Sequence, residues 1–168
     1  LPPLPPSPAI TTLIPANAYA GGNGFSLTVK GRAFVPASVV IWNGSSSITS
    51  FVADSVLQAT ILASDIAFAG TATVAVLNPG NDTSNVLLFT IKPPPPVLTG
   101  LAPSTAIVNS GAFALAVSGA SFRTGAVILW NGSPRVTTFV SASALSAPIS
   151  SLDIATVGPG KVSVVNPG

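Results

Sequence analysis

The sequence predicts an all-β protein built as two tandem β-sandwiches joined by a Pro-rich linker. Three observations lead to this prediction: the chain contains two copies of one unit, a Pro-rich tract precedes each copy, and each copy alternates apolar with polar residues between turn sequences. The length of 168 residues suits one domain or two small ones, so the division rests on these internal features.

An internal repeat divides the chain. Residues 8–80 align with residues 96–168 without a gap, and about 31 of the 73 aligned pairs are identical. Because the loops keep their lengths as well, both copies should share one geometry. We therefore expect one sandwich over residues 8–92 and a second, incomplete at its C-terminus, over residues 96–168.

Pro-rich tracts mark the boundaries of the copies. Residues 1–7 precede the first copy and residues 93–95 separate the two, so the tracts occupy equivalent places in the repeat. Consecutive prolines favour polyproline II, which advances about 3.1 Å per residue and resists bending. We expect short, stiff linkers, with an SH3-type ligand as the alternative interpretation of the prolines.

Each copy carries the pattern of short strands. Apolar and polar residues alternate over residues 25–30, as in a half-buried strand, and Phe113, Leu115 and Val117 repeat the apolar positions of this pattern. Continuous apolar runs at 39–42 and 127–130 indicate strands with both faces covered. Further strands are expected in the first copy near residues 48–52, 57–61, 74–76 and 85–92. About seven short strands separated by turns are typical of a β-sandwich.

Turn sequences connect these strands. Asn43-Gly44 favours a type I′ hairpin into the strand at 48–52, because both residues tolerate positive φ. Asn78-Pro79-Gly80-Asn81 fits a type II turn, with Pro at its second position and Gly at its third. Asp65 is the expected cap of a single short helical turn.

The second copy stops inside a turn that, in the first copy, leads to the last strand. Asn78-Pro79-Gly80 is followed by the strand-like residues 85–92, whereas the sequence closes on Asn166-Pro167-Gly168. We therefore expect the second sandwich to lack its last strand, which leaves a sheet edge and part of the core facing water. Two explanations stay open: the chain is an excerpt of a longer protein, or a neighbouring subunit supplies a strand.

One ordered set of core and turn residues recurs in both copies. In the first copy it runs Ile10, Pro15, Gly21-Gly22, Phe25-x-Leu27-x-Val29-x-Gly31-x-x-Phe34, Val40-x-Trp42-Asn43-Gly44, Leu57-x-Ala59-x-Ile61, Gly70 and Val74-x-Val76-x-Asn78. This order resembles the IPT/TIG family of immunoglobulin-like domains, although the second copy has Asn109-Ser110 in place of the Gly pair. The resemblance implies two immunoglobulin-like sandwiches and no catalytic residue, because the family has no common active site. The uncharged composition is most similar to bacterial cell-surface members.

The composition argues against an enzyme. Charged residues make up 6% of the chain, and His, Cys and Met are absent. There is therefore no imidazole base, no thiolate nucleophile and no zinc site of the usual kinds. The four Asp residues are spread along the sequence, whereas a calcium site needs several carboxylates together. We predict no catalytic residue, no metal and no cofactor.

Charge and hydropathy exclude two further classes. The net charge of +2 comes from scattered basic residues with no run to follow a phosphate backbone, so we expect no nucleic-acid partner. No stretch approaches the roughly 18 apolar residues of a membrane helix, so no membrane span is expected. A chain rich in Ser, Thr, Asn and Gly with few charges suits an extracellular or cell-surface protein.

Three functions stay open. We favour a non-catalytic structural and interaction module of an exported or cell-surface protein, which acts as a rigid repeat in spacing or adhesion. The alternatives are a subunit of a self-assembling extracellular filament and an accessory carbohydrate-binding domain of a polysaccharide-acting enzyme. Protein partners or self-association are expected, with carbohydrate as the other partner class. The candidate contact residues are Val39, Ile41, Trp42, Val127, Leu129 and Trp130. Both Trp residues are expected mainly in the core, and an exposed Trp or Tyr19 would favour a carbohydrate platform.

Overall fold

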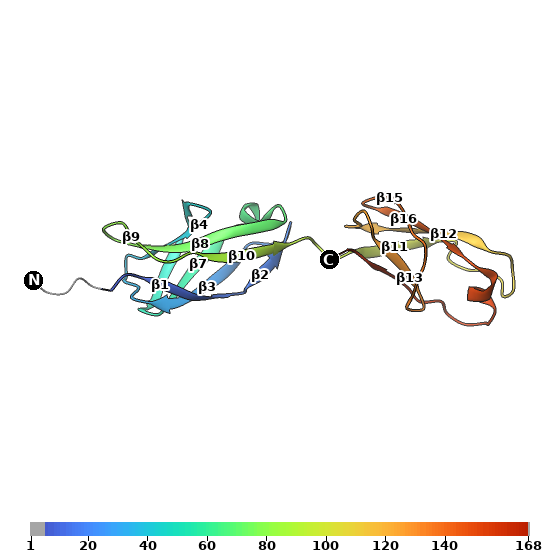
Figure 1. Cartoon of the computed structure of the whole chain (residues 1–168), viewed down its shortest axis with the longest axis horizontal. Helices are drawn as coiled ribbons and strands as arrows, with labels where there is room; N and C mark the ends of the chain where they lie inside the picture. The colour runs from blue at the N-terminus through green and yellow to red at the C-terminus, as the bar shows by residue number, and fades with distance from the viewer. Residues whose placement is uncertain (1–5, 168) are drawn as a thin grey trace, which may run out of the picture. The chain divides into compact units, whose positions relative to one another are not determined.

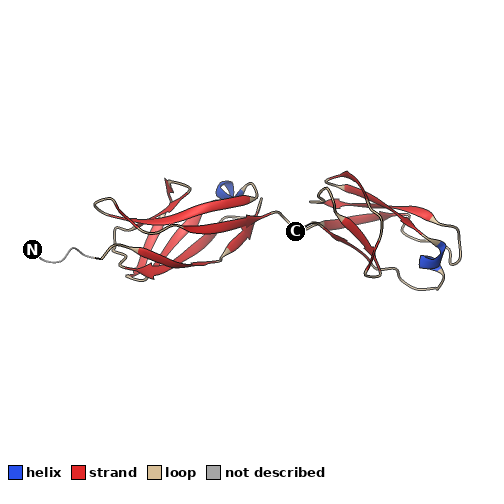
Figure 2. Cartoon of the chain, viewed as in Figure 1, coloured by secondary structure: helices blue, strands red, loops and turns tan. Residues whose placement is uncertain are grey.

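The computed structural model describes residues 6–167 and divides the chain into two compact units, one ending at Pro94 and the other beginning at Pro95 (Figure 1). Residues 1–5 of the expected N-terminal linker and residue 168 of the second copy lie outside the described residues. Each unit consists of β-strands and one short 3-10 helix (Figure 2). The predicted fold class, two tandem immunoglobulin-like β-sandwiches, is confirmed. No helix within residues 6–167 is long and apolar enough to cross a membrane.

The first unit arranges its strands in two sheets. The strand order is β1-β3-β7-β6 in one sheet and β2-β10-β8-β4-β5 in the other, where β9 also pairs with β8. The strands are β1 (Ala9–Ile14), β2 (Asn17–Tyr19), β3 (Phe25–Arg32), β4 (Val39–Trp42), β5 (Ser45–Ser46), β6 (Thr49–Ala53), β7 (Val56–Ile61), β8 (Gly70–Asn78), β9 (Asp82–Thr83) and β10 (Leu87–Lys92). Helix η1 (Ala63–Ile66) connects β7 to β8.

The core of the first unit lies between its two sheets. Alternate residues of β3 point inward, so that Leu27 and Val29 are fully buried. From β10, Phe89 enters the same core and is also fully buried. Its ring centroid lies 5.7 Å from that of Phe25 and 5.1 Å from that of Trp42. The last strand of the first unit, β10, therefore supplies the aromatic residue at the centre of this core.

Glycine permits a close approach between the first two strands of one sheet. A Cβ atom at Gly31 of β3 would lie 2.0 Å from the backbone oxygen of Ala9. The second unit repeats this contact, since a Cβ at Gly119 would lie 2.1 Å from the oxygen of Val97. A larger residue at either position would push the two strands apart.

The predicted Asn-Gly turn is confirmed, but the strand that follows it is not the one expected. Asn43 and Gly44 have φ of 48° and 81°, as a type I′ turn requires. The turn leads into the two-residue strand β5, which pairs with β4. The chain then crosses to the opposite sheet, where β6 pairs with β7. Residues 48–52 are therefore not the second strand of this hairpin.

The short helical turn exists, but Asp65 does not occupy its N-cap. Leu62 is the N-cap residue of η1 and Asp65 is the third residue of the helix. The Asp65 carboxylate reaches back and accepts a hydrogen bond of 2.8 Å from the backbone N–H of Leu62. Asp65 thus satisfies a free N–H at the start of the helix from inside the first turn.

The second unit repeats this plan with fewer strands. The strand order is β11-β12-β16-β15 in one sheet and β14-β13-β17 in the other. The elements are β11 (Val97–Ala102), β12 (Phe113–Ala120), β13 (Val127–Trp130), β14 (Ser133–Pro134), β15 (Thr138–Ser141), β16 (Ala144–Ile149), η2 (Ser151–Ile154) and β17 (Val162–Val165). Within the described part of this unit, no strand stands where β10 stands in the first.

Two strands that pair with β10 in the first unit, β8 and β2, have a shorter counterpart or no counterpart in the described part of the second unit. Strand β8 begins at Gly70, and its residues 70–74 pair with β10, whereas β4 pairs with residues 74–77. The equivalent β17 begins at Val162, four residues later in the repeat, because no strand among the described residues pairs with residues 158–161. Strand β2 pairs with β10 alone, and its counterpart at 105–107 is likewise not a strand.

The second core is correspondingly more open. Four residues of the hydrophobic core of the first unit have equivalents that are only half-buried in the second. The pairs are Ile10 and Leu98, Leu13 and Leu101, Trp42 and Trp130, and Val74 and Val162. All four lie beside the place that β10 occupies in the first unit. Their greater exposure in the second unit therefore follows from the absence of such a strand from its described part.

Replacing Phe89 by Ala should destabilise the first unit by about 3–5 kcal/mol, because the fully buried ring leaves a cavity between Phe25 and Trp42. The second unit should keep its transition, because its core contains a separate set of residues. Denaturant unfolding followed by NMR cross-peaks from each unit measures both. A parallel loss of stability in the second unit would contradict independent cores.

Candidate interaction surfaces

The predicted contact residues of β4 face in two directions. Val40 and Trp42 point into the core and are buried, whereas Val39 and Ile41 point outward and are half-buried. The expectation that both faces of this strand are covered is therefore wrong. Within the described residues, the outward face of its sheet is covered by no second layer of strands.

Outward apolar residues continue across this sheet. Val39 lies opposite Leu77 of β8, and Ile41 lies opposite Ala75. On β10, Leu88 is 66% exposed. We call these five residues the outer apolar face of the first unit.

The second unit has a smaller outer apolar face at equivalent positions. Val127 and Leu129 of β13 are half-buried, and Val127 lies opposite Val165, which is 53% exposed. Ser163 lies opposite Leu129, where the first unit has Ala75. The outer face of the second unit therefore consists of Val127, Leu129 and Val165.

The two Trp residues differ in their surroundings. Trp42 is 4% exposed, and its Nε1 has no hydrogen-bond partner among the described residues. Trp130 is half-buried, and its Nε1 donates to the backbone oxygen of Asp153 at 3.3 Å. Neither ring lies flat on an open surface. Tyr19 on β2 is 51% exposed.

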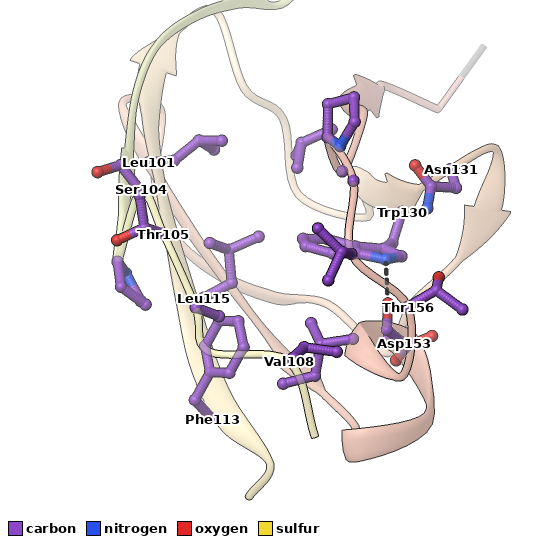
Figure 3. Close-up of a pocket in the computed structure, with 18 residues that line it drawn as sticks. Leu101, Ser104, Thr105, Val108, Phe113, Leu115, Trp130, Asn131, Asp153 and Thr156 are labelled. Atoms are coloured by element: carbon purple, nitrogen blue, oxygen red, sulfur yellow. Dashed lines mark hydrogen bonds between the residues drawn. The ribbon is translucent and has the colours of Figure 1, made fainter. Parts of the chain in front are cut away.

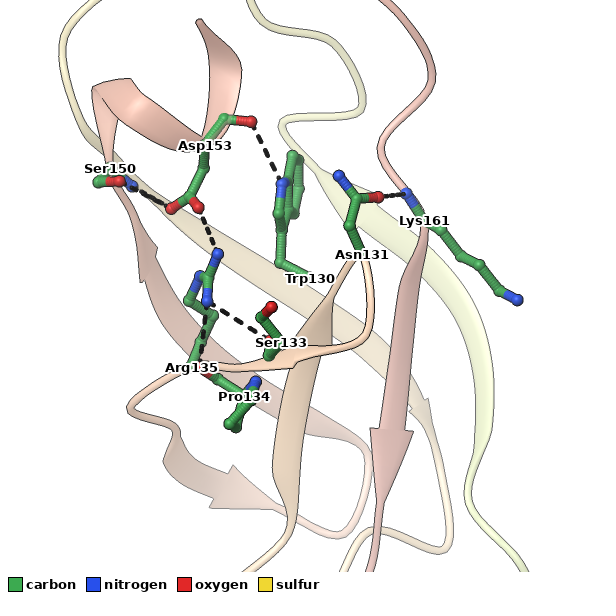
Figure 4. A network of polar contacts seen from close by, with 8 residues as sticks. All are labelled: Trp130, Asn131, Ser133, Pro134, Arg135, Ser150, Asp153 and Lys161. Atoms are coloured by element: carbon green, nitrogen blue, oxygen red, sulfur yellow. Dashed lines mark hydrogen bonds and ion pairs between the residues drawn. The ribbon is translucent and has the colours of Figure 1, made fainter.

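A polar network in the second unit joins η2 to the β13–β14 hairpin (Figure 4). The Asp153 carboxylate accepts hydrogen bonds from the backbone N–H and the hydroxyl of Ser150, at 2.9 and 2.8 Å, and forms an ion pair with Arg135. Arg135 also donates to the backbone oxygen of Pro134 at 3.1 Å. The first unit has Ser47 in place of Arg135 and lacks this ion pair. The sequence analysis missed the pair because its partners lie 18 residues apart on different elements.

The ionised form of Asp153 is the one that this network stabilises. Partial burial opposes ionisation, but the two hydrogen bonds from Ser150 and the guanidinium of Arg135 outweigh it. Together they hold the pKa of Asp153 below its ordinary value of 3.8. The ionised carboxylate thus holds the backbone at the start of η2 in place.

A cavity of about 540 Å³ opens in the second unit (Figure 3). Phe113, Leu115 and Trp130 form part of its wall, and segments 103–108 and 156–160 flank it. Phe113 and Trp130 are the repeat equivalents of Phe25 and Trp42, which contact Phe89 in the first unit. The cavity therefore lies where the inward side chains of β10 would lie.

The corresponding place in the first unit is filled. A smaller cavity of about 150 Å³ lies elsewhere in the first unit, among Trp42, the β5 residues and Asp65. Within residues 6–167, no three His, Cys, Asp or Glu side chains come together in a group that could hold a metal ion.

Comparison with known proteins gave structural neighbours alone. No family model and no curated protein matches the sequence. The extracellular region of plexin A4 is 18% identical, over 95% of this chain and 17% of that chain, with a TM-score of 0.42. The surface glycan-binding protein PbSGBP-B from Prevotella bryantii is 11% identical, over 89% of this chain and 35% of that chain, with a TM-score of 0.41.

A titin fragment, A168169, is 14% identical, over 86% of this chain and 81% of that chain, with a TM-score of 0.40. The chain thus spans well under half the length of the plexin and of the glycan-binding protein. At these identities and TM-scores, the likeness carries no argument about partners or activity.

Replacing Asp153 by Asn should lower the stability of the second unit at neutral pH, because Arg135 loses its charged partner. A carboxyl whose folded-state pKa is lowered contributes stability that is present above its unfolded-state pKa and lost as the pH falls through the folded-state pKa. The difference between parent and variant should therefore shrink below about pH 4. Thermal unfolding of both proteins from neutral to acidic pH measures it.

The matched control is Asp65→Asn, which removes the equivalent carboxylate from the first unit. This change should leave the transition of the second unit at its parental midpoint. If the second unit of the Asp153→Asn protein stayed less stable than that of the parent by the same amount down to about pH 2, the role assigned to the ionised carboxylate would be contradicted.

Proposed function

We propose that this chain is a non-catalytic structural and adhesive module, a pair of IPT/TIG-type immunoglobulin-like repeats of an exported or cell-surface protein. Its contacts are made through the outer apolar faces, which pack against the same faces of other copies. The observation that carries the proposal is the recurrence of outward apolar residues in both units. The corresponding pairs are Val39 and Val127, Ile41 and Leu129, and Leu77 and Val165.

The opposite sheet of the first unit provides a contrast. Its outward side chains on β3 include Ser26, Thr28 and Lys30, and those on β7 are Val56, Gln58 and Thr60, so that all of these but Val56 are polar or charged. A sandwich that needed only to remain in solution would have a polar exterior on both sheets. The difference between the two sheets supports a contact on the apolar side.

The chemistry of this face favours a partner of the same kind. It carries no charged side chain, so a second copy presents a matching apolar surface and no unpaired charge is buried. Each Å² of apolar surface removed from water contributes about 25 cal/mol. A face of a few half-buried side chains therefore supports weak contacts, which become strong when many repeats act together.

The polar side chains support a non-catalytic role. The Asp65 and Asp153 carboxylates accept hydrogen bonds from the backbone at the start of η1 and η2. In the first unit, the Asn78 side chain donates to the backbone oxygen of Ala33 at 2.9 Å. These groups hold turns in place and are not directed together into a cleft.

The paired change Ile41→Lys and Leu129→Lys should weaken self-association of the chain about tenfold or more, because it places a charge on each outer apolar face. The paired control Thr28→Lys and Ala116→Lys adds the same charge to outward positions of the opposite sheets and should leave association unchanged. Sedimentation equilibrium over a wide concentration range measures all three proteins. A parent chain that stays monomeric throughout, or equal weakening by both pairs, would contradict the proposal.

A further inference from the structure

We propose that the second unit binds an extended polypeptide segment, supplied from outside residues 6–167, in the groove between β17 and segment 103–108. The segment carries the pattern Asn85-x-Leu87-x-Phe89-x-Ile91, which combines the inward residues of β10 with the Asn that precedes the strand. This site goes beyond the proposed function, because it uses the inner surface of the sandwich rather than its outer face.

The floor of the groove matches an aromatic side chain. In the first unit, the Phe89 ring packs against Phe25 and Trp42. Their equivalents Phe113 and Trp130 line the cavity of about 540 Å³ (Figure 3). The same chain thus displays both the open groove and, in its other unit, the strand that fills such a groove.

The free edge of β17 can continue the sheet. In the first unit, β10 runs antiparallel to β8, with Leu87 opposite Val74 and Ile91 opposite Gly70. The repeat equivalents of those β8 residues are Val162 and Gly158. Within the described residues, β17 pairs with β13 on one side and with no strand on the other. An added strand would therefore pair with residues 158–162 and extend β17 toward its N-terminus.

The direction of the backbone groups agrees with this pairing. The backbone of Lys161 points toward the β13 hairpin, since its N–H donates to the Asn131 side chain at 2.7 Å and its oxygen accepts the Asn131 N–H at 2.8 Å. Because successive residues of a strand point to opposite sides, Val162 and Val164 direct their N–H and C=O groups to the free edge. Pro159 shares the direction of Lys161, so its missing N–H removes no donor from that edge.

The far side of the groove offers a second anchor. In the first unit, the Asn85 side chain accepts the Ile10 N–H at 2.8 Å and donates to the Ile10 oxygen at 3.0 Å. This pair of bonds fixes the start of the last strand to β1. Leu98 of β11 is the equivalent of Ile10, so an Asn two residues before the first inward apolar residue would bind there.

A polypeptide fits this site better than a sugar. A strand satisfies the row of backbone donors and acceptors along β17 and fills the apolar cavity with alternate side chains. A sugar ring stacks on an exposed aromatic face, whereas the indole of Trp130 is half-buried and its Nε1 is already bonded to Asp153.

The direct test supplies the strand to the whole chain. Residues 81–92 are appended after Gly168, which reproduces the spacing that follows Gly80 in the first unit. Amide hydrogen exchange at Val162 and Val164 should slow about tenfold or more, and the thermal midpoint of the second unit should rise. The matched control carries Phe89→Ser in the appended copy and should lose most of both effects. Exchange at Val74 and Val76 should stay unchanged in both proteins, because β10 already occupies the first unit.

A second arm uses a separate peptide of residues 81–92, which includes the Ser84 that bonds to Val76 in the first unit, with the unaltered chain. Saturable slowing of exchange at Val162 and Val164, weakened about tenfold by Phe89→Ser in the peptide, supports the site. Unchanged exchange in the appended protein would overturn the proposal. Equal effects of the Phe and Ser versions would also overturn it, and so would protection of these amides by a xylogluco-oligosaccharide but not by the appended strand.

Discussion

The contact between Phe89 and the two aromatic residues Phe25 and Trp42 is the interaction on which the rest of the first unit depends. It places the last strand of the unit in the centre of a core whose other parts come from earlier strands. Among the described strands, β2 pairs with β10 alone, and residues 70–73 of β8 also pair with β10. One strand therefore determines how far its neighbours are ordered and how completely the core is closed.

The second unit repeats the sequence pattern of the first, but within its described part no strand occupies the position of β10. Its turns, its 3-10 helix and the sheet β11-β12-β16-β15 match the first unit, because they rest on residues within the repeat. The parts that differ are those that contact β10 in the first unit. An inner groove and an outer apolar face thus arise on the two sides of one sheet, and each presents apolar side chains with few charges to the surroundings.

Local patterns in the sequence were sufficient to predict most of the strands and turns, whereas the errors about sheet membership concern contacts between residues distant in sequence. Alternation over residues 25–30 was sufficient to predict β3, and the Asn43-Gly44 pair was sufficient to predict the turn between β4 and β5, because each depends on neighbouring residues. The crossing from β5 to β6 was not predicted, since the sheet that a strand joins depends on the whole sandwich. The cavity beside Trp130 could be anticipated in part from the repeat, which predicted an incomplete second sandwich, but its volume and lining required the structure.

The most direct test of this account compares equivalent amides within one molecule. Native-state hydrogen exchange of the unaltered chain reports Val74 and Val76, which face β10 and the turn before it, together with Val162 and Val164, which face the open edge. If the last strand closes the core, Val162 and Val164 should exchange about a hundredfold faster than their counterparts. Equal protection of the two pairs would contradict the central role of that strand.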